Sequence, residues 1–137
     1  MTQEFIPYEL ALALKELDFD EPCIMCYYGI SRDDKFDGLY LHTGTGKVCN
    51  THLKEEEDGI TAPTYSQAFK FFREKYGLNG YIQPMIHDDS GIETLNYHPL
   101  IHNIEWNDDA ETCIFFPSWE QAELACLIKL IELVKEK

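Results

Sequence analysis

The last segment of the sequence, Pro117–Lys135, places the strongest constraint on how this chain can fold. Apolar residues cover more than half of the circumference of the predicted helix, and the remaining polar arc is narrow. Such a helix must pack against more than one neighbour, because a single partner would leave much of its apolar surface in water. Ser118 and Gln121 match a capping box, which predicts that the helix begins directly after Ser118.

Two further helices are predicted upstream. Pro7 opens a run of strong helix formers that extends to Leu17. The other helix begins at a second capping box, Thr64 and Gln67, and ends before Gly77, which suits the position after a last helical turn. The two capping boxes share the pattern P-[ST]-[YW]-x-Q-A, which fits either a duplicated strand–helix unit or two independent uses of good capping residues.

The rest of the sequence is prone to form strands. Six segments are rich in strand formers and bounded by turn residues: Cys23–Ile30, Phe36–His42, Lys47–Leu53, Gly80–Ile86, Ile92–Trp106 and Thr112–Phe116. The fifth segment alternates imperfectly and contains Pro99, which predicts one or two edge-like strands there. The sequence therefore predicts an α+β fold, with a mostly antiparallel sheet of about four to six strands packed with three helices. At 137 residues, it is expected to form a single domain over 1–137.

The charge balance excludes several classes of partner. Acidic residues outnumber basic ones by 25 to 11, which gives a net charge of −14. A domain of this charge repels nucleic acid and anionic membrane surfaces. No apolar run reaches the roughly 18 residues that a transmembrane helix needs, and the N-terminus lacks the basic region of a signal peptide. We therefore expect an intracellular protein with no direct contact to nucleic acid or membrane.

The acidic residues are concentrated in the predicted loops, and the stretch between Gly91 and Glu120 contains no Lys or Arg. One interpretation is solvated charge that keeps the protein soluble. The other is an acidic face that binds a basic protein, including one that normally holds nucleic acid. The candidate partner-binding residues are Asp33, Asp34, Asp37, Glu55, Glu56, Glu57, Asp58, Asp88, Asp89, Asp108, Asp109 and Glu111.

The five cysteines offer a competing hypothesis. Cys23-x-x-Cys26 followed by Cys49-x-x-His52 has the spacing of many structural zinc sites. In a regular strand, however, residues three apart point to opposite faces, so chelation would need a tight turn at each pair. The apolar neighbours of Cys23 and Cys26 favour a buried strand. A zinc-stabilised module, or an enzyme built on these four residues, is thus the alternative, while the first interpretation requires no metal or cofactor.

No motif in the sequence predicts catalysis. Neither H-E-x-x-H nor G-x-S-x-G occurs, and Thr43–Val48 departs from a phosphate-binding loop at two positions. We therefore predict that the protein is not an enzyme. A third interpretation, a self-assembling structural protein such as a homodimer, rests on the wide apolar arc of the last helix and on Phe71, which lies off the apolar face of its own helix.

Three segments of the sequence carry a family resemblance: Phe5–Cys23, Ala62–Leu78 and Trp119–Leu127 with its Lys/Leu/Ile tail. Together they resemble a family of small uncharacterised proteins common in phages and prophages of Bacteroides-type bacteria. The resemblance covers the three helices and brings no catalytic residues. It implies an accessory protein of a mobile element that acts in the cytoplasm of a host cell. With the charge, it predicts a non-catalytic protein that binds a host or phage protein, as an inhibitor or nucleic-acid mimic of the anti-defence type.

Overall fold

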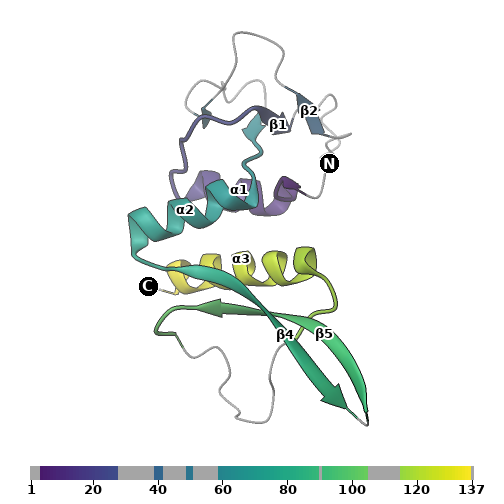
Figure 1. Cartoon of the computed structure of the whole chain (residues 1–137). Helices are drawn as coiled ribbons and strands as arrows, with labels where there is room; N and C mark the ends of the chain where they lie inside the picture. The colour runs from purple at the N-terminus through teal and green to yellow at the C-terminus, as the bar shows by residue number, and fades with distance from the viewer. Residues whose placement is uncertain are drawn as a thin grey trace. The chain divides into compact units, whose positions relative to one another are not determined.

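The structure, a computed structural model, describes residues 4–27, 39–41, 49–50, 59–89, 91–104 and 115–136 (Figure 1). Contacts along the chain divide it into two compact units, Met1–Ala68 and Phe69–Lys137, and each unit is described by itself. The prediction of a single domain over 1–137 stays a prediction. None of the helices in the described ranges is both long and apolar enough to cross a lipid bilayer.

The N-terminal unit combines one helix with a small antiparallel sheet. Its elements are α1 (Tyr8–Glu16), β1 (Met25–Tyr27), β2 (Leu39–Leu41) and β3 (Ile60–Thr61), with β1 in the centre of the sheet. Helix α1 packs against β3, and Leu14 and Phe19 are buried completely. The Tyr27 hydroxyl donates a hydrogen bond to the Ile6 carbonyl at 2.8 Å, which connects β1 to the segment that leads into α1.

Helix α1 confirms the predicted first helix, with a difference at each end. Pro7 is the residue before the first helical position, in an extended conformation, and its carbonyl accepts the N–H groups of Leu10 and Ala11. Asp18 follows the helix with a φ of 65°, a left-handed conformation that turns the chain toward Phe19. The helix is therefore one residue shorter at each end than predicted, with Pro7 at the N-cap and Leu17 at the C-cap.

Helix α2 (Tyr65–Tyr76) begins and ends as the sequence predicts. The Gln67 N–H donates to Thr64 Oγ1 at 3.2 Å, and the Thr64 N–H donates to Gln67 Oε1 at 3.0 Å, so both hydrogen bonds of the capping box are present. Gly77 has a φ of +68°, a left-handed conformation that ends the helix, and the Leu78 N–H donates to the Phe72 carbonyl at 3.1 Å. Phe71 is buried, so it offers no exposed surface for self-assembly.

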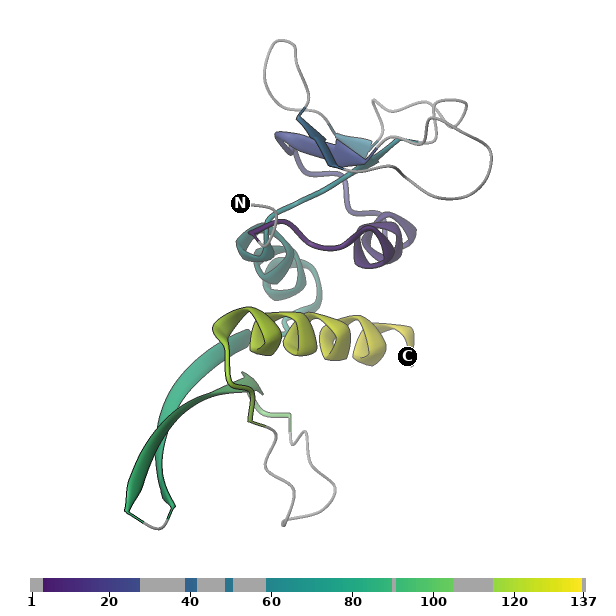
Figure 2. The ribbon, with the colours of Figure 1, turned by 90° about the vertical axis from the view of Figure 1, so that its right-hand side faces the viewer.

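The C-terminal unit contains a long hairpin and the last helix. Strands β4 (Gly80–Asp89) and β5 (Ile92–Ile101) pair along their whole length, and Gly91, with a φ of +81°, lies in the turn. Helix α3 (Trp119–Lys135) packs against both strands, and the end of the hairpin extends past the N-terminal end of the helix (Figures 1 and 2). Ser118 Oγ accepts the Gln121 N–H at 3.2 Å, as the second capping box predicts.

The α+β class, the three helices and the antiparallel pairing are confirmed, but the prediction of one larger sheet is wrong for the described residues. These residues form a three-stranded sheet and a separate two-stranded hairpin. Strand β3 was not predicted from the sequence, because a strand of two residues is too short to show an alternating pattern. It is defined by its pairing with Cys26 and Tyr27. Asn50, inside the predicted third strand, is not in a strand.

Candidate functional site

The strands β4 and β5 place alternate side chains on two sides of the hairpin. Residues that lie opposite each other in the register share a side, and Gly80 pairs with Ile101 at the base of the hairpin. The side that contacts α3, called here the α3-facing side, carries Gly80, Ile82, Pro84, Ile86 and Asp88 on β4 and Glu93, Leu95, Tyr97, Pro99 and Ile101 on β5.

The hydrogen-bond pattern explains how this hairpin accommodates two prolines. The N–H and C=O of Tyr97 bond to Phe116, at 2.8 and 3.0 Å, so they point away from β4. Because backbone direction repeats every two residues along a strand, Pro99 directs its nitrogen away from the partner strand, as does Pro84, which pairs with Tyr97. Neither proline therefore removes a hydrogen bond from the β4–β5 ladder.

The inner half of the α3-facing side, from Gly80 and Ile101 to Pro84 and Tyr97, is the part of the hairpin that α3 contacts. A Cβ atom added to Gly80 would lie 3.0 Å from Cys126 Sγ and 3.0 Å from Leu130 Cδ1, which shows how closely the strand approaches the helix. Ile82 and Ile101 are buried, with 9% and 3% of their surface exposed. The base of the hairpin, from Gly80 and Ile101 to Ile82 and Pro99, therefore belongs to the hydrophobic core of the unit, whereas Pro84 is exposed and Tyr97 is half-buried.

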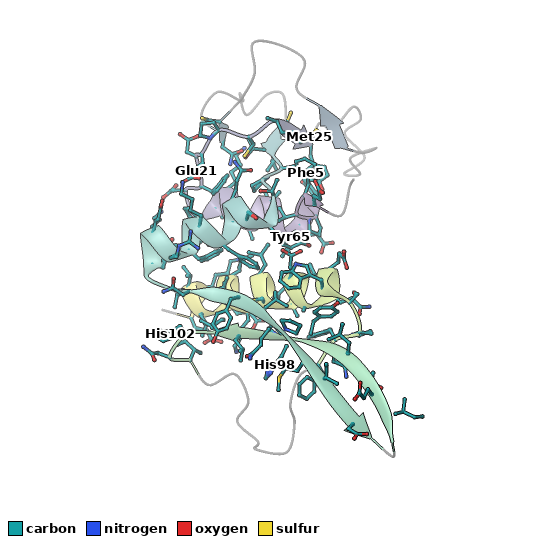
Figure 3. The ribbon with its side chains drawn as sticks, viewed as in Figure 1. Phe5, Glu21, Met25, Tyr65, His98 and His102 are labelled. Carbon is teal, nitrogen blue, oxygen red and sulfur yellow. The ribbon has the colours of Figure 1, made fainter. Side chains whose placement is uncertain are left out.

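The contact between β5 and α3 extends to Tyr97. The Tyr97 and Trp119 rings meet edge to face, with centroids 5.9 Å apart. Trp119 is the first residue of α3, so the helix begins at the level of Tyr97 on the hairpin. On the opposite side, the His98 ring lies 5.0 Å from that of Phe115 (Figure 3).

The outer half of the α3-facing side begins at the next pair, Ile86 and Leu95, and carries apolar side chains in contact with water. Ile86 is 67% exposed and Leu95 is 50% exposed, and the pair before them, Pro84 and Tyr97, is already exposed and half-buried, respectively. The pair beyond them is Asp88 opposite Glu93, both exposed. Like charges directly opposite each other destabilise a sheet, so this pair opposes folding rather than supporting it. The opposite side adds one more exposed aliphatic residue, Ile92, at 68%.

Of the predicted partner-binding residues, the structure places only two. Asp88 and Asp89 lie at the end of β4, and Asp88 is on the α3-facing side. The other ten are outside the described residues: Asp33, Asp34, Asp37, Glu55, Glu56, Glu57, Asp58, Asp108, Asp109 and Glu111. The sequence analysis did not identify Ile86, Leu95 or Glu93. The available signal was the alternation of apolar residues along both strands, which continues beyond the part that α3 covers.

The cysteines of the N-terminal unit are gathered around a buried amide. Asn50 Nδ2 donates to the Phe19 carbonyl at 2.8 Å, and Asn50 Oδ1 accepts the Thr61 N–H at 2.9 Å. Because Thr61 pairs with Cys26 in the sheet, Asn50 holds the Cys49 segment beside β1 and the chain that precedes it. Thr61 is fully buried, and it lies close enough to the Cys23 thiol to interact with it.

The electrostatics of these thiols reflect their burial. Burial raises the pKa of Cys23 to about 12; Thr61 opposes this shift, and the nearby thiols of Cys49 and Cys26 add to it. Desolvation and the carboxylate of Asp20 raise the pKa of Cys49. Thiols with raised pKa values are protonated at neutral pH, so they are poor nucleophiles. Within the described ranges, no three His, Cys, Asp or Glu side chains are positioned to hold a metal ion, and His52 lies outside these ranges.

A shallow apolar pocket of about 270 Å³ lies on α3, lined by Phe116, Gln121, Leu124, Ala125 and Ile128. Its lining contains one polar side chain and no titratable one, so it has no group for acid–base or nucleophilic chemistry.

Comparisons with protein-family models, curated proteins and solved structures returned no match for this chain.

Proposed function

We propose that this protein is a non-catalytic binding protein whose partner is a basic protein. The observation that carries the proposal is the outer half of the β4–β5 hairpin, where Ile86 and Leu95 are exposed beside the acidic pair of Asp88 and Glu93. Exposed aliphatic side chains on an ordered strand are costly in water, and a cluster of them bordered by charge is typical of a protein-binding surface.

The charge distribution supports a basic partner. From Gly77 to Ile128 the sequence contains no Lys or Arg, so no positive side chain of this stretch offsets the hairpin acids. Complementary charge on a partner would accelerate association and would remove the repulsion between Asp88 and Glu93. On this proposal the protein acts as an inhibitor or nucleic-acid mimic of the anti-defence type, in the cytoplasm of a host cell.

The experiment is a pull-down with the full chain from host-cell extract, carried out at low and at high salt, with identification of bound proteins by mass spectrometry. We expect one basic protein to be recovered in stoichiometric amount and its yield to fall at high salt, because exposed charge pairs are screened. For a nucleic-acid mimic, DNA or RNA would compete with this protein for the partner. Recovery of no protein at low salt, or binding that is indifferent to salt, would contradict the proposal.

A zinc-stabilised module is the second candidate, because Cys49 lies near Cys23 and Cys26; the three thiols are not positioned together to hold a metal ion, so they would have to shift to bind one. His52 would supply the fourth ligand, and zinc bound by three thiolates and an imidazole would stabilise the N-terminal unit. Metal analysis of the purified chain decides this candidate: one zinc per chain, lost in Cys49→Ser, supports it. Absence of stoichiometric zinc from protein purified without chelator would rule it out.

A further inference from the structure

We propose that the outer half of the α3-facing side of the hairpin is the surface on which the partner docks. Its occupant is an extended basic segment of the partner protein. In this segment an aliphatic side chain is flanked, two residues away, by Lys or Arg. This inference rests on the proposed function and specifies where and how the partner binds. It starts from the exposed pair of Ile86 and Leu95, which lies on the same side of the hairpin as the buried Ile82 and Ile101, beyond the pair of Pro84 and Tyr97.

The apolar part of this surface identifies the first element of the partner. The row formed by Ile82, Pro84 and Ile86 on β4 has the same spacing throughout, and the ring contact of the hairpin with the first residue of α3 is made by Tyr97. Beyond that point Ile86 and Leu95 form a directly opposed aliphatic pair, 67% and 50% exposed. An aliphatic side chain laid on this pair would extend the core that α3 begins.

The charged part identifies the second element. Asp88 and Glu93 form the next pair outward on the same side, so the acids lie two residues from the apolar pair along each strand. Two residues of a strand span about 7 Å, which is also the distance between same-side residues of an extended peptide. A Lys or Arg placed two residues from the aliphatic side chain would therefore reach both carboxylates and offset their repulsion.

The edge of β5 favours an extended partner over a helical one. Phe116 pairs with Tyr97 along this edge, and the chain then leaves it, because Ser118 begins α3. Backbone direction repeats every two residues along a strand, so Leu95 and Glu93 have the same direction as Tyr97. Their N–H and C=O groups therefore point away from β4. A segment that adds to a strand edge gains backbone hydrogen bonds as well as side-chain contacts.

A second copy of this chain is a poorer occupant. Each copy would bring its own Asp88 and Glu93 to the contact, and like charges brought together oppose association. A monomeric mass in light scattering is therefore expected, and self-association that is lost in Ile86→Ser would overturn the choice of a basic partner.

The test measures binding of fluorescent peptides to the full chain. The main probe is a short peptide with a leucine flanked on both sides, two residues away, by lysines. One control peptide replaces the leucine with serine, and another moves the lysines to four-residue, helical spacing. We expect the main probe to bind about tenfold more tightly than either control, which is the effect of burying one aliphatic side chain in the matching register.

Matched variants locate the binding site. Ile86→Ser and Leu95→Ser should each weaken binding of the main probe by about tenfold, whereas Ile92→Ser, equally exposed on the opposite side, should change it by less than about twofold. The double variant Asp88→Asn/Glu93→Gln should weaken binding at low salt more than Glu4→Gln/Glu136→Gln, which removes the same charge elsewhere. Unchanged circular dichroism and thermal unfolding would show that the variants are folded.

The outcomes separate this inference from the proposed function. Equal binding of the leucine and serine peptides, or equal losses for Ile86→Ser and Ile92→Ser, would overturn the docking surface and leave a basic partner in place. Failure of both the leucine and the serine peptide to bind would also overturn the proposal that the partner docks on this surface. The salt-dependent pull-down tests the proposed function independently.

Discussion

The inner and outer halves of the β4–β5 hairpin have the same backbone pairing and the same alternation of side chains, yet their surroundings are opposite. In the inner half Ile82 and Ile101 are buried, and Gly80 allows α3 to approach the strand closely. In the outer half Ile86 and Leu95 are exposed and are followed by the like-charged pair of Asp88 and Glu93. The buried residues of the inner half therefore contribute to stability, whereas the exposed aliphatic pair and the like-charged pair of the outer half do not.

The largest expected effect is in the inner half. Ile101→Ala should lower the free energy of unfolding by about 2–5 kcal/mol, because Ile101 is 3% exposed and the truncation leaves a cavity. The matched change in the outer half, Ile86→Ala, should alter it by less than about 0.5 kcal/mol. Urea unfolding monitored by circular dichroism measures both values, and equal effects would remove the distinction between the two halves.

The next largest effect concerns the close approach of α3. Gly80→Ala should destabilise the protein by about 1–3 kcal/mol, because the new methyl group would meet Cys126 Sγ and Leu130 Cδ1 at 3.0 Å. Combining it with Cys126→Ala removes one of these atoms, so the double variant should be more stable than the sum of the single effects predicts. Additive effects in this double-mutant cycle would show that the strand and helix are not in close contact.

The stability of the protein should depend on pH through the buried thiol of Cys126. Burial raises the pKa of the Cys126 thiol from 9.0 to about 12, so between these values only the unfolded chain loses the proton. The stability gained by keeping the Cys126 thiol protonated in the folded chain is complete below about pH 9 and is lost as the pH rises toward about 12. At about pH 10 the loss is about 1 kcal/mol. The midpoint temperature of thermal unfolding should therefore fall less steeply with rising alkaline pH in Cys126→Ala than in the wild type. Identical slopes would contradict the burial of this thiol.

The smallest expected effect is in the outer half and has the opposite sign. Glu93→Gln should raise the free energy of unfolding by about 0.2–1 kcal/mol, because it removes the repulsion with Asp88 across the strands. The gain should shrink at high salt, since both side chains are exposed. A loss of stability in Glu93→Gln at low salt would mean that this residue makes a favourable contact within the chain.

The helices and their ends could be predicted from the sequence because their determinants are local. Thr64 and Gln67 bond to each other, Gly77 closes the same helix, and Ser118 caps α3, all within a few residues. The division into two sheets could not be predicted, since β3 forms only through its pairing with Cys26 and Tyr27.

The candidate site could be predicted only in part, for a similar reason. The acidity of Asp88 and Asp89 and the turn after them are visible in the sequence. The exposure of Ile86 and Leu95 is not, because the same apolar alternation precedes them in the buried half. What distinguishes the two halves is the position where α3 begins, marked by the contact between Trp119 and Tyr97, and this depends on tertiary packing.

Hydrogen exchange of the full chain with and without the lysine–leucine peptide tests directly whether the peptide docks on the outer half of the hairpin. We predict that the amides of Glu93 and Leu95, which point away from β4, gain protection when the peptide binds, while those of α3 do not change. Protection confined to other parts of the chain, with Glu93 and Leu95 exchanging at the same rate in both samples, would contradict the account.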